Sequence, residues 1–382
     1  MFVRVGLLSM LVLAHAEVVR GATTVQTLNP WPGIYGESAA DMTRDGSLVV
    51  GSVKTYGEGR YETYRWNTST NFEMLGWVLG AGSLPRAISS DGRVIVGTVN
   101  ADIGYNSASP FYWKDGEGAT FPGLLPGGHY AWATGVSADG STMVGYGDNP
   151  ASVAWKWTAS GGYQILPMPA GFTSAWTAPH GISATGDTIA GYVQGGNAST
   201  FPARWTASGV QVCPVQGFAQ AIQPDGQAIL FASNGAERWR VDGTIETLGT
   251  YPNSLATWPN ATSDDGSIVG GSGIIAPYTG RAWIWTSTLG LVDLHDYLAS
   301  RGIDVSQWTF DSVEAISADG TKICGFGTHR YGSGYSRDET FIVTVPGPVS
   351  APILAIGALV ANLRKRPTLS TRSRAPCSAA TC

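Results

Sequence analysis

A short turn sequence that recurs seven times constrains the fold of this chain more than any other feature. In each copy a strand-like segment precedes Asp-Gly or Thr-Gly and an apolar segment follows it, and successive copies are 40 to 54 residues apart. That period is typical of one four-stranded propeller blade. Thr185 begins one copy, and the other six begin with Asp45, Asp91, Asp139, Asp225, Asp265 and Asp319.

Each copy predicts the same order of strands. A first strand runs into the Asp-Gly hairpin, and a second, apolar strand mostly ends at a glycine such as Gly97 or Gly145. A third strand ends at an aromatic residue, which we expect to pack between neighbouring sheets. A carbohydrate-stacking array is the alternative interpretation of these rings. They are Trp66, Trp113, Trp157, Trp205, Trp239, Trp285 and Phe341.

The last copy lacks a fourth strand, because Phe341 to Val345 runs directly into the C-terminal tail. Residues 25–28 have the fourth-strand pattern and precede the first copy. The sequence therefore predicts an all-β, seven-bladed propeller of four-stranded antiparallel blades, closed by pairing of the N-terminal strand with the last blade. An open solenoid of seven sheets is the alternative.

The Asp-Gly pairs are interpreted as structural turns. An aspartate carboxylate accepts hydrogen bonds from nearby backbone N–H groups, and glycine adopts the positive φ that tight hairpins require. Thr185 in one copy is consistent with a turn, and a required ligand would not tolerate that exchange. We therefore do not expect these aspartates to bind a ligand.

Both termini carry the features of sorting signals. Residues 1–16 have a charged start, an apolar run from Val5 to Leu13 and a small-x-small cleavage site, which is the pattern of a signal peptide; a cut after Ala22 is the alternative. The propeller is expected to span residues 25–345. Residues 346–382 form a tail with an apolar stretch and the basic triplet Arg364-Lys365-Arg366. We expect export across the inner membrane.

Composition excludes several classes of function. The net charge of -5, without a basic run outside the tail, argues against a nucleic-acid partner. The histidines show no metal-ligand spacing, and there is no nucleophile elbow or phosphate loop, so no cofactor or metal is predicted. Cys213 and Cys324 are expected to be small buried residues, and Cys377 and Cys382 fall in the tail.

Aromatic residues in the connections between blades are the candidate ligand-binding residues. Such connections gather on one propeller face, where rings beside polar groups hold sugars or peptides. Covering the tops of the blades is the alternative role. The candidates are Trp31, Trp77, His129, Tyr130, Trp132, Trp176, His180, Trp258 and Trp308.

Two functions remain open on this pattern. The leading hypothesis is a non-enzymatic surface or matrix protein that binds glycan or protein through one propeller face. The alternative is an extracellular polysaccharide hydrolase or lyase, which needs two carboxylates converging in the channel. The acidic residues near the predicted beginnings of blades are Glu37, Asp41, Asp304, Asp311 and Glu314.

The repeat, with its Ser, Asp-Gly, closing Val-Gly and following Trp, resembles that of bacterial exported HAF-family proteins over about residues 25 to 345. The Val-Pro-Gly-Pro segment at 345–348, the apolar stretch and the basic triplet resemble a degenerate PEP-CTERM sorting tail. These resemblances imply export, a cell-surface or extracellular location, and a tail that engages an exosortase-like membrane enzyme and holds the protein transiently at the membrane. They imply no catalytic residues.

Overall fold

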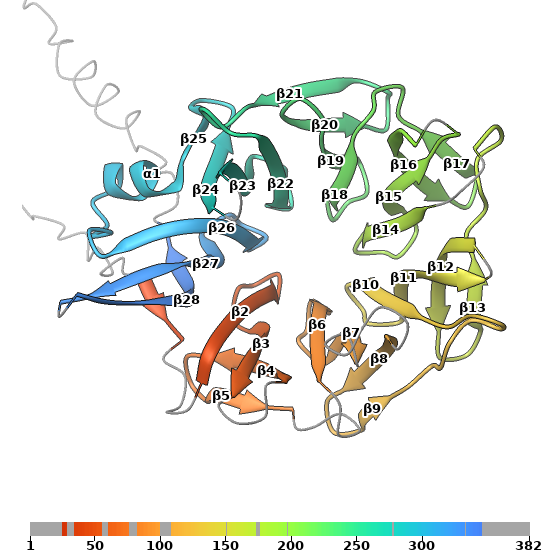
Figure 1. The fold of residues 1–382 in the computed structure, drawn as a ribbon, viewed down its shortest axis with the longest axis horizontal. Coiled ribbons are helices and arrows are strands. Elements are labelled where there is room, and N and C mark those ends of the chain that lie inside the picture. Colours follow the sequence, from red (N-terminus) through yellow and green to blue (C-terminus); the bar gives the residue numbers. More distant parts are fainter. Residues whose placement is uncertain are drawn as a thin grey trace, which may run out of the picture. The chain divides into compact units, whose positions relative to one another are not determined.

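The computed structural model describes residues 25–28, 34–55, 60–75, 82–99, 108–149, 151–172, 176–196, 198–276, 279–332 and 334–345. The predicted signal peptide and C-terminal tail lie outside these residues. The described residues form seven four-stranded sheets arranged in a ring (Figure 1). Residues of the inner strands line a cavity on the ring axis, which we call the central channel. In this part of the chain, no helix has the length and apolar character needed to cross a membrane.

Four blades occupy the first half of the ring. Blade 1 consists of β2 (Ile34–Met42), β3 (Val49–Thr55), β4 (Tyr61–Asn67) and β5 (Asn71–Met74). Blade 2 consists of β6 (Ser83–Ile88), β7 (Val94–Val99), β8 (Ser109–Lys114) and β9 (Gly118–Thr120). Blade 3 consists of β10 (Ala131–Val136), β11 (Thr142–Asn149), β12 (Ala151–Thr158) and β13 (Gly162–Ile165). Blade 4 consists of β14 (Thr177–Ile182), β15 (Ile189–Gln194), β16 (Thr200–Thr206) and β17 (Gly209–Val212).

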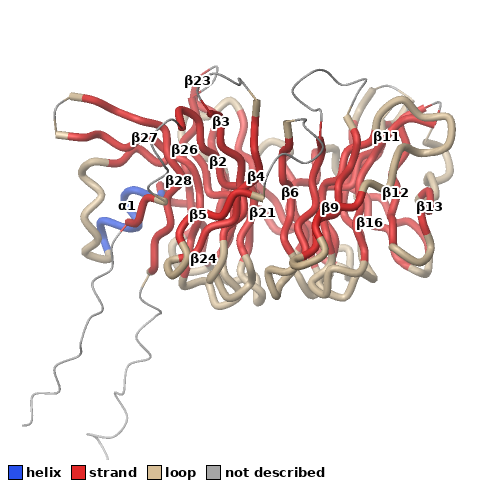
Figure 2. Tube along the Cα trace, turned by 90° about the horizontal axis from the view of Figure 1, so that it is seen from below, coloured by secondary structure: helices blue, strands red, loops and turns tan. Residues whose placement is uncertain are grey.

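Three further blades complete the ring. Blade 5 consists of β18 (Phe218–Ile222), β19 (Ala228–Ala232), β20 (Ala236–Arg240) and β21 (Ile245–Gly249). Blade 6 consists of β22 (Ala256–Thr262), β23 (Ile268–Ala276), β24 (Thr279–Thr286) and β25 (Gly290–Asp293). The helix α1 (Leu294–Ser300) leads into blade 7, which contains β26 (Trp308–Ile316), β27 (Lys322–Tyr331) and β28 (Tyr335–Thr344). Seen from the side, the strands run between the two faces of the ring (Figure 2).

The ring closes through the N-terminal strand, as the sequence predicts. β1 (Val25–Thr27) pairs antiparallel with β28, with Val25 opposite Val343 and Thr27 opposite Phe341. Blade 7 therefore has the strand order β1-β28-β27-β26. The predicted seven-bladed fold and its closure are confirmed, and the open solenoid is excluded.

The Asp-Gly hairpins have the hydrogen bonds expected of turns. In blade 3 the Asp139 carboxylate accepts the Ser137 hydroxyl at 2.6 Å and the Ser141 N–H at 2.9 Å. Gly140 has a φ of 72°, in the left-handed region. These two hydrogen bonds hold the pKa of Asp139 below its ordinary value. The carboxylate is therefore used within its own turn.

The repeated aromatic residues fill the space between blades. Trp66, Trp205 and Trp239 are each less than a tenth exposed. Several are covered by a cation from the preceding blade: the Arg204 guanidinium lies 4.6 Å from the Trp239 ring centroid, and that of Arg238 lies 5.0 Å from Trp285. The regular arginine before the tryptophan thus joins neighbouring blades.

One predicted repeat position is wrong. Phe341 was aligned with Trp66, but Phe341 pairs with Gly325 just as Tyr64 pairs with Gly51. Phe341 therefore corresponds to Tyr64, two residues before the tryptophan position, which Val343 occupies in blade 7. The third strand of the last blade, β28, contains no tryptophan that could mark this position in the sequence.

Hydrogen bonds around the channel link the inner strands of neighbouring blades at one end. In most of these bonds, the residue just before the turn aspartate or threonine donates its backbone N–H. The acceptor is the carbonyl of the corresponding residue in the next blade. These bonds are Ser90 to Ala138 (2.9 Å), Ala138 to Ala184 (3.0 Å), Ala184 to Pro224 (2.7 Å), Asp264 to Ala318 (3.0 Å) and Ala318 to Arg44 (2.7 Å).

Side chains supply the two remaining links. Pro224 has no N–H, and the Gln223 Nε2 group donates to the Asp264 carbonyl at 3.0 Å in its place. Between blades 1 and 2 the Asp41 carboxylate accepts the Ile88 N–H at 3.0 Å. All seven junctions around the channel are therefore hydrogen-bonded, which fixes the positions of the inner strands.

Candidate functional site

The inner strand of every blade contains a β-bulge at the same place. In blade 3, Ala133 pairs with Gly145 and Gly135 with Val144, so Thr134 is an extra residue without a partner opposite. The bulge residues lie five positions before the Asp or Thr of the turn, and all line one channel cavity of about 510 Å³. We call them the neck residues. They are Ala40, Arg86, Thr134, His180, Gln220, Asn260 and Glu314.

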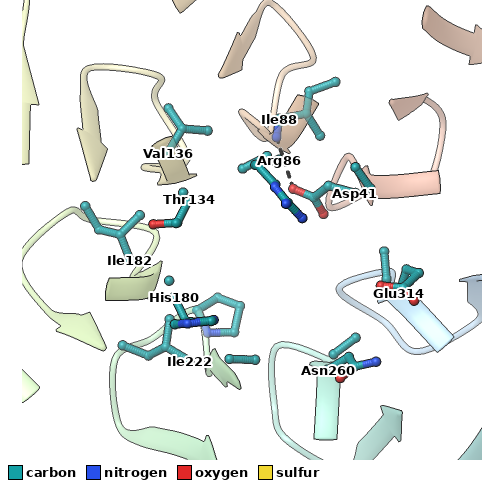
Figure 3. A pocket seen from close by; sticks show the side chains of 18 of the residues that line it. Asp41, Arg86, Ile88, Thr134, Val136, His180, Ile182, Ile222, Asn260 and Glu314 are labelled. Carbon is teal, nitrogen blue, oxygen red and sulfur yellow. Dashed lines mark hydrogen bonds between the residues drawn. The ribbon is translucent and has the colours of Figure 1, made fainter. Parts of the chain in front are cut away.

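Figure 3 shows how the neck side chains converge. Arg86, Thr134, His180, Asn260 and Glu314 come from five different inner strands and surround the same space. The bulge is what brings them there, because an extra residue re-aims its side chain relative to the regular ladder. Six neck residues carry polar side chains, and each of the six is of a different type.

Aromatic rings line the cavity beside the neck residues of blades 3 and 4. Trp132 and Tyr146 are cross-strand partners whose rings stack at 6.5 Å with an angle of 10°. Tyr192 packs against His180 with ring centroids 5.4 Å apart. All four residues line the cavity, so aromatic faces and polar groups lie together in it.

The row of rings continues onto blades 5 and 6. Phe218 lies edge-on to Tyr192, with centroids 5.5 Å apart, and 5.9 Å from Trp258. Phe218 is 41% exposed although it is apolar. Phe218 and Trp258 occupy the position of Trp132, two residues before the neck residue of their own blade. We call Trp132, Tyr146, Tyr192, Phe218 and Trp258 the aromatic wall.

Charged groups gather on the opposite side of the channel, on blades 7, 1 and 2. Asp41 follows the neck residue of blade 1, and both its carboxylate oxygens accept backbone N–H groups, from Met42 at 2.7 Å and from Ile88 at 3.0 Å. Burial nevertheless raises the pKa of Asp41 to about 6. Burial also raises the pKa of Glu314.

His180 is an uncharged member of the neck. Burial, and to a smaller extent the positive charge of Arg86, lower the pKa of His180 to about 4. At neutral pH the imidazole is therefore neutral, with one nitrogen able to donate a hydrogen bond and the other able to accept one. The neck residues of blades 3 to 6 thus carry no charge, in contrast to those of blades 7 and 2.

Three neck side chains make no hydrogen bond to any described residue: Arg86, His180 and Gln220. The others are used within the protein. Thr134 donates to the Val144 carbonyl at 3.3 Å, and the Asn260 amide reaches Ser312 and Val313. All three side chains line the cavity, where a ligand can form hydrogen bonds with them.

The predicted ligand-binding residues divide into several places. Trp132 and His180 line the channel cavity, and Trp258 belongs to the aromatic wall. Trp176 is 49% exposed and does not line the cavity. Trp31 and Trp77 lie outside the described residues.

His129, Tyr130 and Trp308 lie away from the channel cavity. The Asp148 carboxylate binds both His129, at Nδ1, and the Tyr130 N–H. Trp308 stacks face to face on His329, with centroids 4.5 Å apart, and lines a cleft of about 690 Å³ beside α1. The predicted single aromatic surface is therefore divided between the channel and other parts of the ring.

Of the candidate carboxylates, only Asp41 and Glu314 line the channel cavity. Glu37 is buried between blades 1 and 7, where it accepts the Thr340 N–H and burial raises its pKa to about 7. Asp311 forms an ion pair with Arg281, and Asp304 accepts the Ser306 N–H. No group of three or more His, Cys, Asp or Glu side chains in the described ranges is arranged to hold a metal.

Sequence reasoning missed Arg86, Thr134, Gln220 and Asn260. A signal was present: the position five residues before the turn Asp or Thr varies in type while its neighbours repeat. Cys213 and Cys324 are buried and free, as the sequence predicts. Cys377 and Cys382 lie outside the described residues.

Comparison with known proteins identifies a fold. No protein-family model and no curated protein matches the chain. A prolyl endopeptidase structure is 10% identical with a TM-score of 0.56, over 82% of this chain and 51% of its own, so this chain spans about half of that enzyme. TolB from Acinetobacter baumannii is 13% identical over 78% of this chain and 79% of its own, with a TM-score of 0.45.

The propeller domain of the trilobed protease from Pyrococcus furiosus is 12% identical, over 81% of this chain and 95% of its own, with a TM-score of 0.49. At such identities the likeness concerns the fold alone. The chain is a seven-bladed β-propeller by its own sheet topology, and its fold is similar to part of the prolyl endopeptidase structure.

Proposed function

We propose that the protein is an exported, non-enzymatic binding protein that takes a carbohydrate into the mouth of its channel. The observation that carries this proposal is the position of two neutral side chains, His180 and Gln220, which line the cavity beside the rings of the aromatic wall and make no hydrogen bond to a described residue. Aromatic rings offer apolar faces to sugars, and the neutral polar groups offer hydrogen bonds to hydroxyls.

The choice of a sugar over a peptide rests on the chemistry of blades 3 to 6. Their neck residues are a hydroxyl, an imidazole and two amides, all uncharged. A buried polar group that loses water must be paired in the complex, and sugar hydroxyls can both donate and accept in a small space. A protein ligand, the other alternative from the sequence, would have to insert a loop into the cavity.

Export rests on the predicted N-terminal signal peptide, and surface or matrix attachment on the tail that resembles a sorting signal. The ligand is accordingly an extracellular glycan. Processing by an exosortase-like membrane enzyme would leave the propeller outside the inner membrane. Cell fractionation of the full chain, compared with a chain ending at Val345, tests whether the tail directs this attachment.

A glycan array on the purified mature protein tests the carbohydrate site. Phe218→Ala removes an exposed ring of the aromatic wall, and we expect binding of any glycan hit to fall at least fivefold, in line with ~1 kcal/mol or more for a stacking ring. Tyr335→Ala, which removes a ring that is 59% exposed on β28, is the matched control. Equal loss in both variants, or no loss in either, contradicts the proposal.

An extracellular polysaccharide hydrolase or lyase is the second candidate. It is favoured by two carboxylates with raised pKa, Asp41 and Glu314, in one cavity. Asp41 already uses both oxygens for backbone N–H groups, which favours a structural role for it. Product release from a bound polysaccharide, abolished by Glu314→Gln, would establish the enzyme; binding without product supports the non-enzymatic protein.

A further inference from the structure

We propose that the carbohydrate bound in the channel carries a carboxylate, as a uronic acid does, and that Arg86 binds that carboxylate. This inference rests on the proposed carbohydrate site and names its ligand class. A neutral sugar would leave the positive charge of Arg86, on blade 2, without a counter-charge.

Arg86 is a cation without a partner in the part of the chain that the structure describes. No carboxylate there lies within 4 Å of it, although its side chain is exposed to the channel cavity. Two other arginines of blade 1 are paired: Arg44, in the turn after β2, with Asp264, and Arg65, on β4, with both Glu73 and Asp115. A positive group kept unpaired inside a cavity favours an anionic ligand.

The nearest acidic groups are placed where they do not satisfy Arg86. Asp41 accepts two backbone N–H groups, and Arg44 is the cation that lowers its pKa. Glu314 lies across blade 1 from Arg86, beyond ion-pair distance. Burial raises the pKa of Glu314, and the positive charge of Arg86 partly opposes this rise; the same charge adds to the lowering of the pKa of His180 by burial. The guanidinium therefore interacts electrostatically with groups on blades 7 and 4.

The position of Arg86 suits a sugar held by the aromatic wall. Blade 2 adjoins blade 3, whose Thr134 lies near Arg86 in the same cavity (Figure 3). Trp132 of blade 3 also lines this cavity. A sugar ring against the wall would lie with one edge toward Arg86. The guanidinium group is planar and can donate two parallel hydrogen bonds to a carboxylate, which a lysine cannot reproduce. A bound uronic acid would therefore contact both the uncharged neck residues of blades 3 to 6 and the charged Arg86 of blade 2.

The groups that face Arg86 around the neck also give the site a pH dependence. Asp41 and Arg44 face it from blade 1, Glu314 from blade 7 and His180 from blade 4; Thr134, Gln220 and Asn260 are neutral. As the pH falls from 8 to 5.5, Asp41, whose pKa is about 6, takes up a proton while His180 remains neutral. Repulsion of an acidic sugar decreases, so its affinity rises at the lower pH.

Three β-1,4-linked trisaccharides of the same backbone test the inference: one of glucose, one of glucuronic acid and one of glucosamine. Calorimetry on the mature protein at pH 5.5 should show the acidic trisaccharide binding at least tenfold more tightly than the glucose one. Arg86→Gln should remove this preference, so that the acidic and glucose trisaccharides bind with similar affinity. Arg86→Lys should retain only part of it.

Arg330→Gln is the charge-matched control, because Arg330 lies outside the channel cavity and has no carboxylate within 4 Å among the described residues. It should keep the preference for the acidic sugar. Equal binding of glucose and glucuronic acid, or tightest binding of glucosamine, overturns the role of Arg86 while the carbohydrate site stands. Failure of all three sugars to bind overturns both proposals.

Discussion

Each blade has a neck residue on its inner strand and, five positions later, the Asp or Thr of its turn. The turn residue is nearly constant between blades, whereas the neck residue varies. Six of the seven turns have aspartate, and its carboxylate is bonded inside the hairpin, as in Asp139. The neck has a different residue in every blade, and Arg86, His180 and Gln220 make no hydrogen bond to a described residue. Repetition marks the groups that build the ring, and variation at a fixed backbone position marks those that face a ligand.

The two regions also differ in electrostatics. The turn carboxylates, such as Asp139 and Asp319, have pKa values below their ordinary value because hydroxyl and N–H donors stabilise the charged form. Asp41 and Glu314 have raised values, because burial disfavours their charge. Ionisation thus stabilises the turns and destabilises the neck.

The largest effect on stability is expected from replacing a closely packed glycine of the repeat. Gly145→Ala places a methyl group against the Trp132 carbonyl oxygen and the Trp155 ring, which leaves no room for it between β10 and β12. We expect the free energy of unfolding to fall by about 3 kcal/mol. Chemical denaturation measures it. Gly332→Ala, where nothing lies within 4 Å, should be close to neutral, and equal stabilities of the two variants would contradict this packing account.

A second test uses pH to separate the regions. The folded pKa of Asp41, about 6, exceeds its ordinary 3.8, so the folded state binds this proton more tightly and stability falls as the pH rises from 4 to 6. For a partly exposed group we expect a loss of about 2 kcal/mol. Asp41→Asn should remove that part of the slope in denaturation curves from pH 4 to 7.

Asp139→Asn, in the Asp-Gly turn of blade 3, is the matched control. Its carboxyl has a lowered pKa, so its stabilisation is complete above pH 3.8 and is lost only as the pH falls through the folded value. This variant should leave the profile between pH 4 and 7 parallel to that of the unmodified protein. Glu37, whose pKa burial raises to about 7, keeps part of the slope in both variants. A slope in Asp41→Asn as steep as that of the unmodified protein would contradict the assignment to Asp41.

A third test asks whether the neck is dispensable for folding. Gln220→Ala removes a side chain that bonds no described residue. We expect affinity for a glycan ligand to fall about tenfold, equivalent to ~1.4 kcal/mol. Its unfolding free energy should change by less than about 0.5 kcal/mol, as for other substitutions away from packed contacts. Calorimetric binding and denaturation on the same sample measure both; a stability loss without a binding loss would reverse the assignment.

The smallest effect is expected in a single turn. Asp139→Ala removes the acceptor for the Ser137 hydroxyl and the Ser141 N–H, which remain close to solvent, so we expect a loss of about 1 kcal/mol. Ligand affinity should be unchanged. Thermal denaturation measures the stability loss, and a glycan titration measures the affinity. Weakened binding would show that the Asp-Gly turns are not purely structural.

The fold could be predicted because its signals are local and repeated. The turn, the apolar second strand and the buried tryptophans such as Trp205 recur at a fixed period, and the displaced fourth strand was identifiable at Val25. The site was predictable only in part. Trp132 and His180 were predicted as loop aromatics. Arg86 and Gln220 stand at a position that varies between the repeats, but the bulge that turns them inward depends on the register between two strands and is not visible in either strand alone.

The sequence by itself determined the number of blades, the turns and the strand that closes the ring, since each depends on contacts within one repeat or on a pattern missing from one end. Only the tertiary structure decided which side chains meet. Arg86, His180 and Glu314 come from blades 2, 4 and 7, and their proximity follows from the closed ring and its seven bulges. Periodicity specifies a strand's faces, but convergence on a common axis exists only once all seven blades are packed around it.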